Sequence, residues 1–244
     1  MLSFLLFGGK MYKAILFDLD GTLVPMDMDV FTRAYMKAIS AKFVSMGVPL
    51  DAFLDTLWNG VGAMMRNDGK EKNSVVFWER FETAFGGDAK TYKRETDPFY
   101  ENEFDELKAL TAPNPLARRA VELAAENGRR VVLATNPIFP HNAQLTRMTW
   151  VGLLESDFDF ITDYESDSFC KPNPKYYLSI CERLGVSPDE CLMVGNDESD
   201  DMKGASAAGL DCFLVTDCLI PCKDFEWQGE RGSFEDLIKK LESL

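Results

Sequence analysis

The stretch AILFDLDGTL, residues 14–23, is the most informative segment of this chain. Its first four residues form a continuous apolar run, which is typical of a strand buried on both faces of a parallel sheet. Two carboxylates, Asp18 and Asp20, follow at once, and Gly21 permits a tight backbone turn behind them. Paired carboxylates at a strand end can share a divalent cation, or one can attack while the other transfers protons. The stretch therefore predicts a buried strand that leads into a chemical site.

Four more apolar runs predict further strands of the same sheet. They lie at residues 131–134, 160–162, 191–194 and 212–215, and each follows a segment with helical spacing of its apolar residues. Strands that alternate with helices are typical of a parallel sheet with right-handed crossovers. The chain is therefore expected to form an α/β core.

A long segment without strand signals interrupts this alternation directly after the first strand. Between residues 27 and 110, apolar residues recur at three- and four-residue steps. Glycine-containing breaks at residues 47–49, 67–69 and 86–87 divide the segment, and a fourth helix is expected near residues 98–110. The pattern predicts about four helices inserted into the α/β core.

The charge of the chain limits its partners. The 244 residues include 26 basic and 40 acidic side chains, a formal net charge of −14. Nucleic acids and anionic membranes repel such a charge, so neither is expected as a partner. No uncharged apolar run approaches the ~20 residues of a membrane span. The apolar stretch at residues 2–7 lacks the features of a secretory leader, so we expect a cytoplasmic protein in which residues 1–10 are an N-terminal extension.

Polar residues also follow the other predicted strands, at the edge where open parallel sheets bind ligands. Thr135 and Asn136 follow the second strand, Lys171 lies in a proline-rich loop after the third, and an acidic cluster at residues 196–201 follows the fourth. Each segment alone has an ordinary interpretation, as a turn, a solvated lysine or a helix start. Together, and in this order at strand ends, they predict one shared site.

The order of these four motifs resembles the haloacid dehalogenase superfamily, in its phosphatase branch. The match covers residues 12–216, and the helical insertion lies where this family has its type 1 cap. The resemblance implies an α/β fold with a Rossmann-like parallel sheet core, residues 11–25 and 111–244, and an inserted helical cap, residues 26–110. It also implies a phosphoric monoester hydrolase.

The same resemblance implies a role for each motif. Asp18 would be the nucleophile that forms an aspartyl phosphate, and Asp20 would protonate the leaving oxygen and then activate water. Thr135, Asn136 and Lys171 would bind the phosphoryl group. Mg²⁺ would be bound by Asp18 and by the backbone carbonyl of Asp20. These roles agree with elementary chemistry, because a carboxylate is ionised at neutral pH and needs cations to overcome its repulsion from phosphate.

The fourth motif departs from the family pattern. The family has glycine followed by an acid, and here Asn196 stands in the place of the acid. Either Asn196 binds Mg²⁺ through its side-chain oxygen, which we favour, or Asp197 turns inward and replaces it. Asp201 is expected to hold Lys171 or a metal-bound water, and Asp200 to be a solvated helix residue.

We therefore predict a Mg²⁺-dependent phosphatase that acts on a small-molecule phosphate ester. A sugar phosphomutase would use the same residues and remains an alternative. So does a non-catalytic phosphate-binding or regulatory homologue, which the departure at Asn196 favours. A dehalogenase is disfavoured, because a halide leaves without a proton and would not need Asp20.

The aromatic and methionine residues of the insertion have two interpretations. They could line an apolar substrate pocket, but at helical spacing they are more often the core of the cap itself. We favour the core interpretation, and we interpret the two cations near the second break as surface residues. The residues concerned are Trp58, Met64, Met65, Phe77 and Trp78, and the cations are Arg66 and Lys70.

Overall fold

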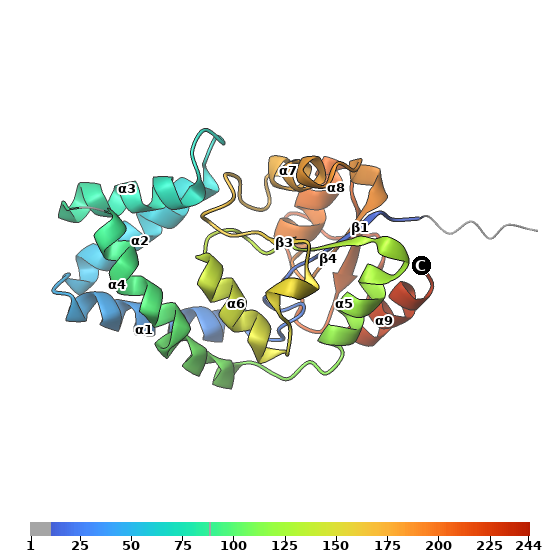
Figure 1. The fold of residues 1–244 in the computed structure, drawn as a ribbon, viewed down its shortest axis with the longest axis horizontal. Coiled ribbons are helices and arrows are strands. Elements are labelled where there is room, and N and C mark those ends of the chain that lie inside the picture. Colours follow the sequence, from blue (N-terminus) through green and yellow to red (C-terminus); the bar gives the residue numbers. More distant parts are fainter. Residues whose placement is uncertain (1–10, 88) are drawn as a thin grey trace, which may run out of the picture.

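Strand β1, Ala14–Phe17, lies in the middle of a parallel sheet in the computed structural model. The structure describes residues 11–87 and 89–244, so the predicted N-terminal extension, residues 1–10, lies outside the described residues. Within the described part, the sheet has six strands in the order β3-β2-β1-β4-β5-β6 (Figure 1). All four side chains of β1 are fully buried, as the apolar run predicts.

The other strands include the four that the sequence predicts. Their ends align in register, so that Phe17 of β1 lies beside Leu133 of β2 and Val194 of β4. A sixth strand of two residues is too short to produce a pattern in the sequence. The bounds are β2 Arg130–Leu133, β3 Phe160–Ile161, β4 Cys191–Gly195, β5 Asp211–Val215 and β6 Arg231–Gly232.

Helices cover both faces of the sheet (Figure 1). Side chains of β1 alternate between the faces. Ile15 and Phe17 belong to the apolar cluster that includes residues of α5 and α9, and Leu16 belongs to the cluster with α7 and α8. The helices of the core are α5 Ala117–Ala125, α6 His141–Trp150, α7 Pro174–Leu184, α8 Gly204–Ala208 and α9 Phe234–Glu242.

The insertion between β1 and α5 is entirely helical in its described residues. It contains three of the predicted helices, but the prediction for residues 98–110 is partly wrong. An α-helix ends at Glu101, and residues 103–110 form a 3₁₀ helix. The charged composition of residues 89–97 obscures the amphipathic pattern of the fourth helix. The bounds are α1 Met28–Ser45, α2 Leu50–Met65, α3 Asn73–Phe85, α4 Ala89–Glu101 and η1 Glu103–Leu110.

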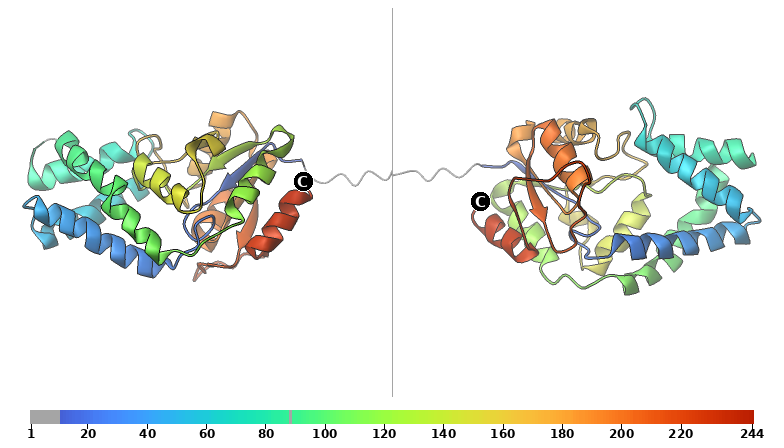
Figure 2. Two further views of the ribbon diagram at one scale, coloured as in Figure 1. Left: turned by 60° about the horizontal axis from the view of Figure 1, so that its bottom comes forward. Right: turned by 180° about the vertical axis from the view of Figure 1, so that it is seen from behind.

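The helices of the insertion stand beside the carboxyl ends of the strands (Figure 2). Two chain segments connect them to the core, and these segments run side by side. Met26 and Thr111 form an antiparallel bridge, and the amide of Ala112 donates to the carbonyl of Pro25 over 2.9 Å. The predicted fold class, a Rossmann-like parallel sheet with an inserted helical cap, is confirmed.

Among the described residues, no helix combines the length and the apolar character that crossing a membrane requires.

Candidate active site

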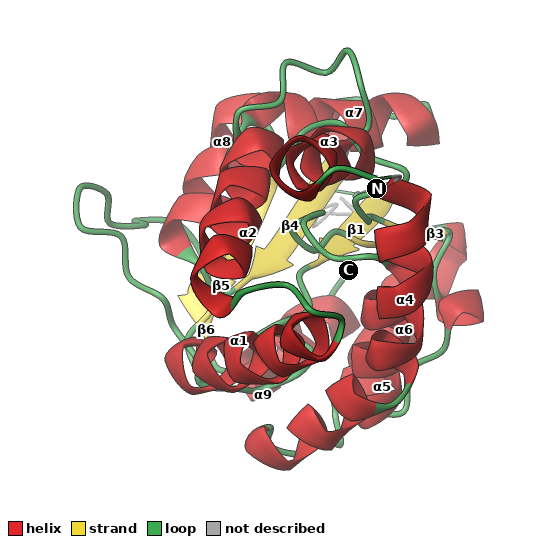
Figure 3. Cartoon of the chain, turned by 90° about the vertical axis from the view of Figure 1, so that its left-hand side faces the viewer, coloured by secondary structure: helices red, strands yellow, loops and turns green. Residues whose placement is uncertain are grey.

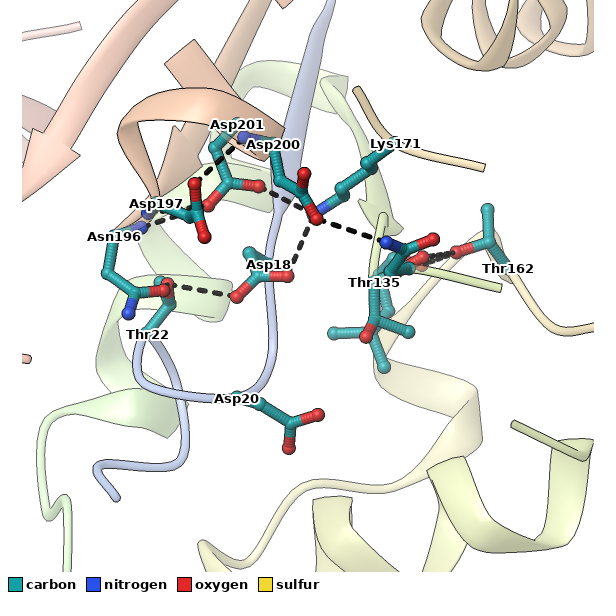
Figure 4. A network of polar contacts seen from close by, with 12 residues as sticks. Asp18, Asp20, Thr22, Thr135, Thr162, Lys171, Asn196, Asp197, Asp200 and Asp201 are labelled. Carbon is teal, nitrogen blue, oxygen red and sulfur yellow. Dashed lines mark hydrogen bonds and ion pairs between the residues drawn. The ribbon is translucent and has the colours of Figure 1, made fainter. Parts of the chain in front are cut away.

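Lys171 joins two carboxylates at the carboxyl ends of the strands (Figure 4). Its side chain is 1% exposed, and Nζ donates to Asp18 Oδ1 over 2.8 Å and to Asp201 Oδ1 over 2.6 Å. Burial disfavours the charged lysine, but Asp18 and Asp201 outweigh this effect, so the pKa of Lys171 is raised well above its usual value. The ammonium therefore keeps its charge in the interior of the site.

The loop after β1 places Asp18 beside Asn196, which follows β4. The buried Thr22 hydroxyl lies 3.2 Å from Asp18 Oδ2 and 2.9 Å from Asn196 Oδ1. Gly21 turns this loop at φ +84°, and a side chain there would collide with the amide of Asn196. The glycine of the first motif is therefore required both for the turn and for this close approach.

A π-helical turn after β4, η5 (Glu198–Lys203), positions Asp201. Asp201 Oδ2 accepts hydrogen bonds from the amides of Asn196 and Asp197, each over 3.0 Å, while Oδ1 binds Lys171. Asp197 instead caps the turn, because its Oδ1 accepts from the amides of Ser199 and Asp200. Of the two interpretations of Asp201, the structure supports contact with Lys171.

Thr135 lies near Lys171 (Figure 4). Thr135 and Asn136 both follow shortly after the end of β2. The Thr135 carbonyl accepts from the hydroxyls of Thr162, over 2.7 Å, and Tyr176, over 2.9 Å, which fixes the backbone at this strand end. The Asn136 side-chain amide donates to Asp200 Oδ2 over 3.0 Å. The strand end is thus tied to η5 across the site.

The prediction that Asp200 is a solvated helix residue is wrong. Its carboxylate is partly buried beneath Asn136, and its carbonyl accepts from the hydroxyl of Tyr177 over 2.6 Å. Burial, followed by the charge of nearby Asp197, raises the pKa of Asp200 to about 6. The π-helical geometry explains the error, because spacing on an ordinary α-helix does not predict which side chains of this turn face inward.

The Asp20 side chain stands apart from the Asp18 network (Figure 4). It pairs with Arg147 of α6. Arg147 is fully buried, and its guanidinium lies 4.4 Å from the ring centre of Phe139. In the described structure, Asp20 Oδ1 is buried without a hydrogen-bond partner. Burial raises the pKa of Asp20, while the charge of Arg147 acts in the opposite direction. Arg147 therefore favours the ionised form of this carboxyl group.

Sequence reasoning does not find Arg147. It lies 127 positions from Asp20, in an amphipathic helix where one arginine is usually a surface residue. Thr22 and Asp201 lie inside the quoted motifs, so their proximity to the site could have been inferred from the strand ends. The polar contact between Thr22 and Asn196 could not, because it depends on how two loops meet.

The comparisons with known proteins agree with this geometry. A family model described as haloacid dehalogenase-like hydrolase matches residues 12–209. The chain belongs to this family. A phosphoglycolate phosphatase of Nitrosospira multiformis is 26% identical over 210 residues, which are 83% of this chain and 82% of that protein. The prediction of a phosphoric monoester hydrolase is therefore supported.

Two solved structures of haloacid dehalogenase-like proteins share the fold. A phosphatase from Thermococcus onnurineus has a TM-score of 0.59 and 24% identity, with 94% of this chain and 97% of that chain covered. A hydrolase from Bacillus subtilis, described as bound to magnesium, has a TM-score of 0.55 and 22% identity, with 95% and 99% covered. At this level of identity the two structures support the fold of the chain and not its substrate.

The oxygen atoms beside Thr22 fit a magnesium ion. Asp18 Oδ2 and Asn196 Oδ1 both approach one hydroxyl, which has a single proton, so one of the two oxygens always lacks this donor. The amide of Asn196 is oriented, because its nitrogen donates to the carbonyl of Cys218 over 2.7 Å. Within residues 11–87 and 89–244, no group of three or more histidine, cysteine or acidic side chains could hold a metal. A pair of carboxylate and amide oxygens suits Mg²⁺ better than Zn²⁺.

A cavity of about 280 Å³ lies between the cap helices and the Asp20 loop. Seen from the cap end, the cap helices and α6 surround the ends of β1 and β4 (Figure 3). Phe77 and Trp78 line this cavity and are also buried members of the hydrophobic core, so both interpretations apply to them. The core interpretation is wrong for Trp58, which lines the cavity but is 55% exposed. Met64 is fully buried elsewhere in the cap.

The two cations near the second break are surface residues, as interpreted from the sequence. Arg66 is exposed. Lys70 has 83% of its side chain exposed and pairs with Asp68. Neither residue lines the cavity.

Proposed function

We propose that this hydrolase is a Mg²⁺-dependent phosphatase that cleaves a small phosphate monoester through an aspartyl phosphate on Asp18. The observation that carries the proposal is the buried Lys171 ammonium, which is held against Asp18 by a second carboxylate, Asp201. A structural ion pair would need one carboxylate. Asp201 holds the ammonium in place beside Asp18, where it could also contact a phosphoryl oxygen.

The reaction divides into two displacements. An Asp18 oxygen attacks phosphorus, the ester P–O bond breaks, and the leaving oxygen takes a proton from Asp20. Asp20, now a carboxylate, removes a proton from water, the water oxygen attacks phosphorus, and the bond to Asp18 breaks to release inorganic phosphate. Asp18 needs no base to become nucleophilic, because a carboxylate is already ionised at neutral pH.

Lys171, Thr135 and Asn136 are proposed to bind the phosphoryl oxygens. Lys171 balances the negative charge that Asp18 would otherwise direct at phosphate. Thr135 is 3% exposed and follows shortly after the end of β2, so its hydroxyl is close to the strand end where phosphate is expected to bind.

Mg²⁺ is proposed to bind Asp18, the backbone carbonyl of Asp20 and the side-chain oxygen of Asn196. When bound, it would neutralise charge on the phosphoryl group. Asn196 is preferred to Asp197 as the ligand, because the Asp197 Oδ1 is already engaged by two backbone amides. With the neutral Asn196 as a ligand, the metal site has one carboxylate fewer than it would have with an acid at position 196.

Arg147 is proposed as a positioning residue for Asp20. By favouring the carboxylate, it assists the step in which Asp20 activates water, and it opposes the step in which Asp20 donates a proton. The Asp20 side chain must leave Arg147 to reach an ester oxygen near Asp18, so this ion pair restrains the acid between turnovers.

Hydrolysis of phenyl phosphate, with Mg²⁺ and with a chelator, tests the proposed function. We expect release of phosphate that depends on Mg²⁺, and we expect Asp18→Asn to lose turnover by a factor on the order of 10³ or more. Asp55→Asn, at an exposed position of α2, is the matched control and should keep full activity. A non-catalytic phosphate-binding protein would bind phosphate without metal-dependent release, and that result would overturn the proposal.

A further inference from the structure

We propose that the substrate is a phosphate monoester of an uncharged, apolar alcohol or phenol, and that its apolar part occupies the cap cavity. This inference rests on the proposed phosphatase function and adds the chemical class of the leaving group. The phosphoglycolate phosphatase relative, by contrast, is named for a substrate with a carboxylate in its leaving group.

The position of the cavity connects it to the reacting atoms. Asp20 is two residues from Asp18 and is also part of the cavity lining. The oxygen that takes a proton from Asp20 must therefore lie at the border of the cavity. A leaving group attached to that oxygen could enter the cavity, which is lined by Asp20 and by residues of the cap helices.

The lining offers few free polar groups to a ligand. The hydroxyls of Tyr35 and Tyr100 bind each other over 2.9 Å, and Trp78 Nε1 donates to the Tyr164 hydroxyl over 3.1 Å. Burial raises the pKa of Tyr35 to about 12, so its hydroxyl stays neutral. Most of the remaining surface is aliphatic or aromatic carbon, from residues such as Ile39, Leu57, Val61, Phe77 and Phe139. A sugar chain or another polyhydroxyl group would lose its hydrogen bonds to water here without replacement.

The charge of the lining excludes a second anion. Among the described residues that line the cavity, Asp20 is the one with a formal charge, and it is negative. Arg147, the cation that pairs with Asp20, also binds Gln144. A carboxylate in the leaving group would therefore be buried without a cationic partner and beside a negative charge, which is strongly unfavourable.

The volume limits the size of the apolar group. A dry apolar cavity of ~150 Å³ is sufficient to bind benzene. The cavity here is about 280 Å³. A single aromatic ring with its linking carbon, or an aliphatic chain of comparable size, therefore fits. Trp58, which is 55% exposed, lies at the outer part of the lining and leaves a route for larger groups to reach solvent.

Two matched esters test the inference: benzyl phosphate and 4-carboxybenzyl phosphate. Both are primary alkyl esters, so they differ mainly in one carboxylate on the ring. We expect kcat/KM for benzyl phosphate to exceed that for the carboxylated ester by about 100-fold, and to exceed that for phosphoglycolate by a similar factor. Equal values, or a preference for the carboxylated esters, would overturn the inference while leaving the phosphatase function intact.

A cation placed in the lining should weaken this preference. Val61→Lys introduces the charge at a half-buried lining position of α2, and we expect it to lower the ratio of the two kcat/KM values at least tenfold. Val61→Met tests length without charge and should retain the original ratio. Asn59→Lys adds the same charge at an exposed position of α2 outside the cavity, and it should also retain the ratio. An unchanged ratio in folded Val61→Lys would contradict the location of the leaving group.

A binding measurement makes the test independent of turnover and of the folding of Val61→Lys. Trp58 and Trp78 line the cavity and can report on ligands by fluorescence. Titration of the wild-type chain with benzylphosphonate should change tryptophan emission at concentrations about 100-fold lower than 4-carboxybenzylphosphonate requires. If neither ester is hydrolysed but this binding preference is present, the proposed catalysis fails and the apolar site stands. If the two phosphonates bind alike, the inference about the cavity is wrong.

Discussion

The polar cluster of Lys171, Asp18 and Asp201, called the rim here, and the cavity in the cap both border the loop after β1. The rim consists of charged side chains, whereas the cavity is lined mainly by apolar ones. At the rim, buried polar groups hold one another: Lys171 binds two carboxylates, and Asp201 also accepts two backbone amides. In the cavity, the described lining is almost entirely apolar, and the polar side-chain atoms of Tyr35, Tyr100, Tyr164 and Trp78 are paired within the protein. The rim is suited to an anion and the cavity to an uncharged group.

In the proposed function, the core binds the phosphoryl end of the substrate and the cap binds its apolar end. The sheet fixes the charged chemistry at the carboxyl ends of β1, β2 and β4, where backbone geometry is rigid. The cap contributes side chains from four helices, where substitutions can alter shape and polarity without moving the rim. Asp20 belongs to both regions, since it follows β1 and also lines the cavity.

The largest effect is expected from removing the cation of the rim. Lys171→Met leaves Asp18 and Asp201 buried without their partner, so turnover should fall by 10² to 10³ or more, and the free energy of unfolding should fall by roughly 3–5 kcal/mol. Urea unfolding and phosphate release measure the two effects. Adding Asp201→Asn should recover part of the stability but none of the activity, because one of the two unpaired charges is removed.

Lys203→Met is the control for this experiment, since Lys203 lies in the same π-helical turn and is exposed. It should change neither quantity by more than experimental error. If Lys171→Met were as stable and active as this control, the proposed role of the Lys171 charge in the rim would be wrong.

A smaller effect on activity is expected from replacing Arg147, which pairs with Asp20 where the rim meets the cavity. Arg147 lowers the pKa of Asp20 against the effect of burial, so Arg147→Met should raise that pKa further. An alkyl phosphate needs a proton from Asp20, and its hydrolysis falls as pH rises through the pKa of this group. The basic limb of the kcat/KM profile should therefore move to higher pH.

Arg147→Lys provides the conservative comparison, because it keeps a positive charge near Asp20. We expect its pH profile to lie between those of the wild type and Arg147→Met. A basic limb that moved to lower pH in Arg147→Met, or that did not move, would show that Arg147 acts on packing alone.

The smallest effect is expected at the metal ligands. Asn196→Asp adds a carboxylate beside Asp18 in a position where Thr22 can donate to it. The concentration of Mg²⁺ needed for half-maximal activity should fall by several-fold, because another anionic oxygen faces the ion. In the absence of metal the same variant should be less stable than the wild type, since two carboxylates then repel each other. An unchanged Mg²⁺ requirement would argue against Asn196 as a ligand.

Much of the architecture could be predicted from the sequence, because it depends on patterns among neighbouring residues. The apolar run at residues 14–17, the alternation of strands and helices, and the Asn173 cap of α7 all depend on neighbours in the sequence. The four motifs could be placed at one edge, because carboxyl ends of parallel strands share that edge. Their order in the chain was sufficient to indicate the family.

The rest depends on contacts between distant segments. The ion pair of Asp20 with Arg147 joins residues 127 positions apart, and no local pattern marks either partner for the other. Asp200 turns inward because η5 is π-helical, which α-helical spacing does not predict. Whether Trp58 packs in the cap core or lines a cavity depends on how four helices leave space between them, and that cannot be read from helical periodicity.

Phosphorylation of Asp18 is the most direct test of the account. Asp20→Asn should slow attack by water more than formation of the aspartyl phosphate when the leaving group is a phenol, since a phenol needs little help from an acid. Acid quench of this variant with phenyl phosphate and Mg²⁺, followed by peptide mass spectrometry, should therefore find one phosphoryl group on the peptide that contains residues 14–23, at Asp18. Phosphate release by the wild type without any phosphoryl group on Asp18 in the variant, or with the group on another residue, would contradict the account.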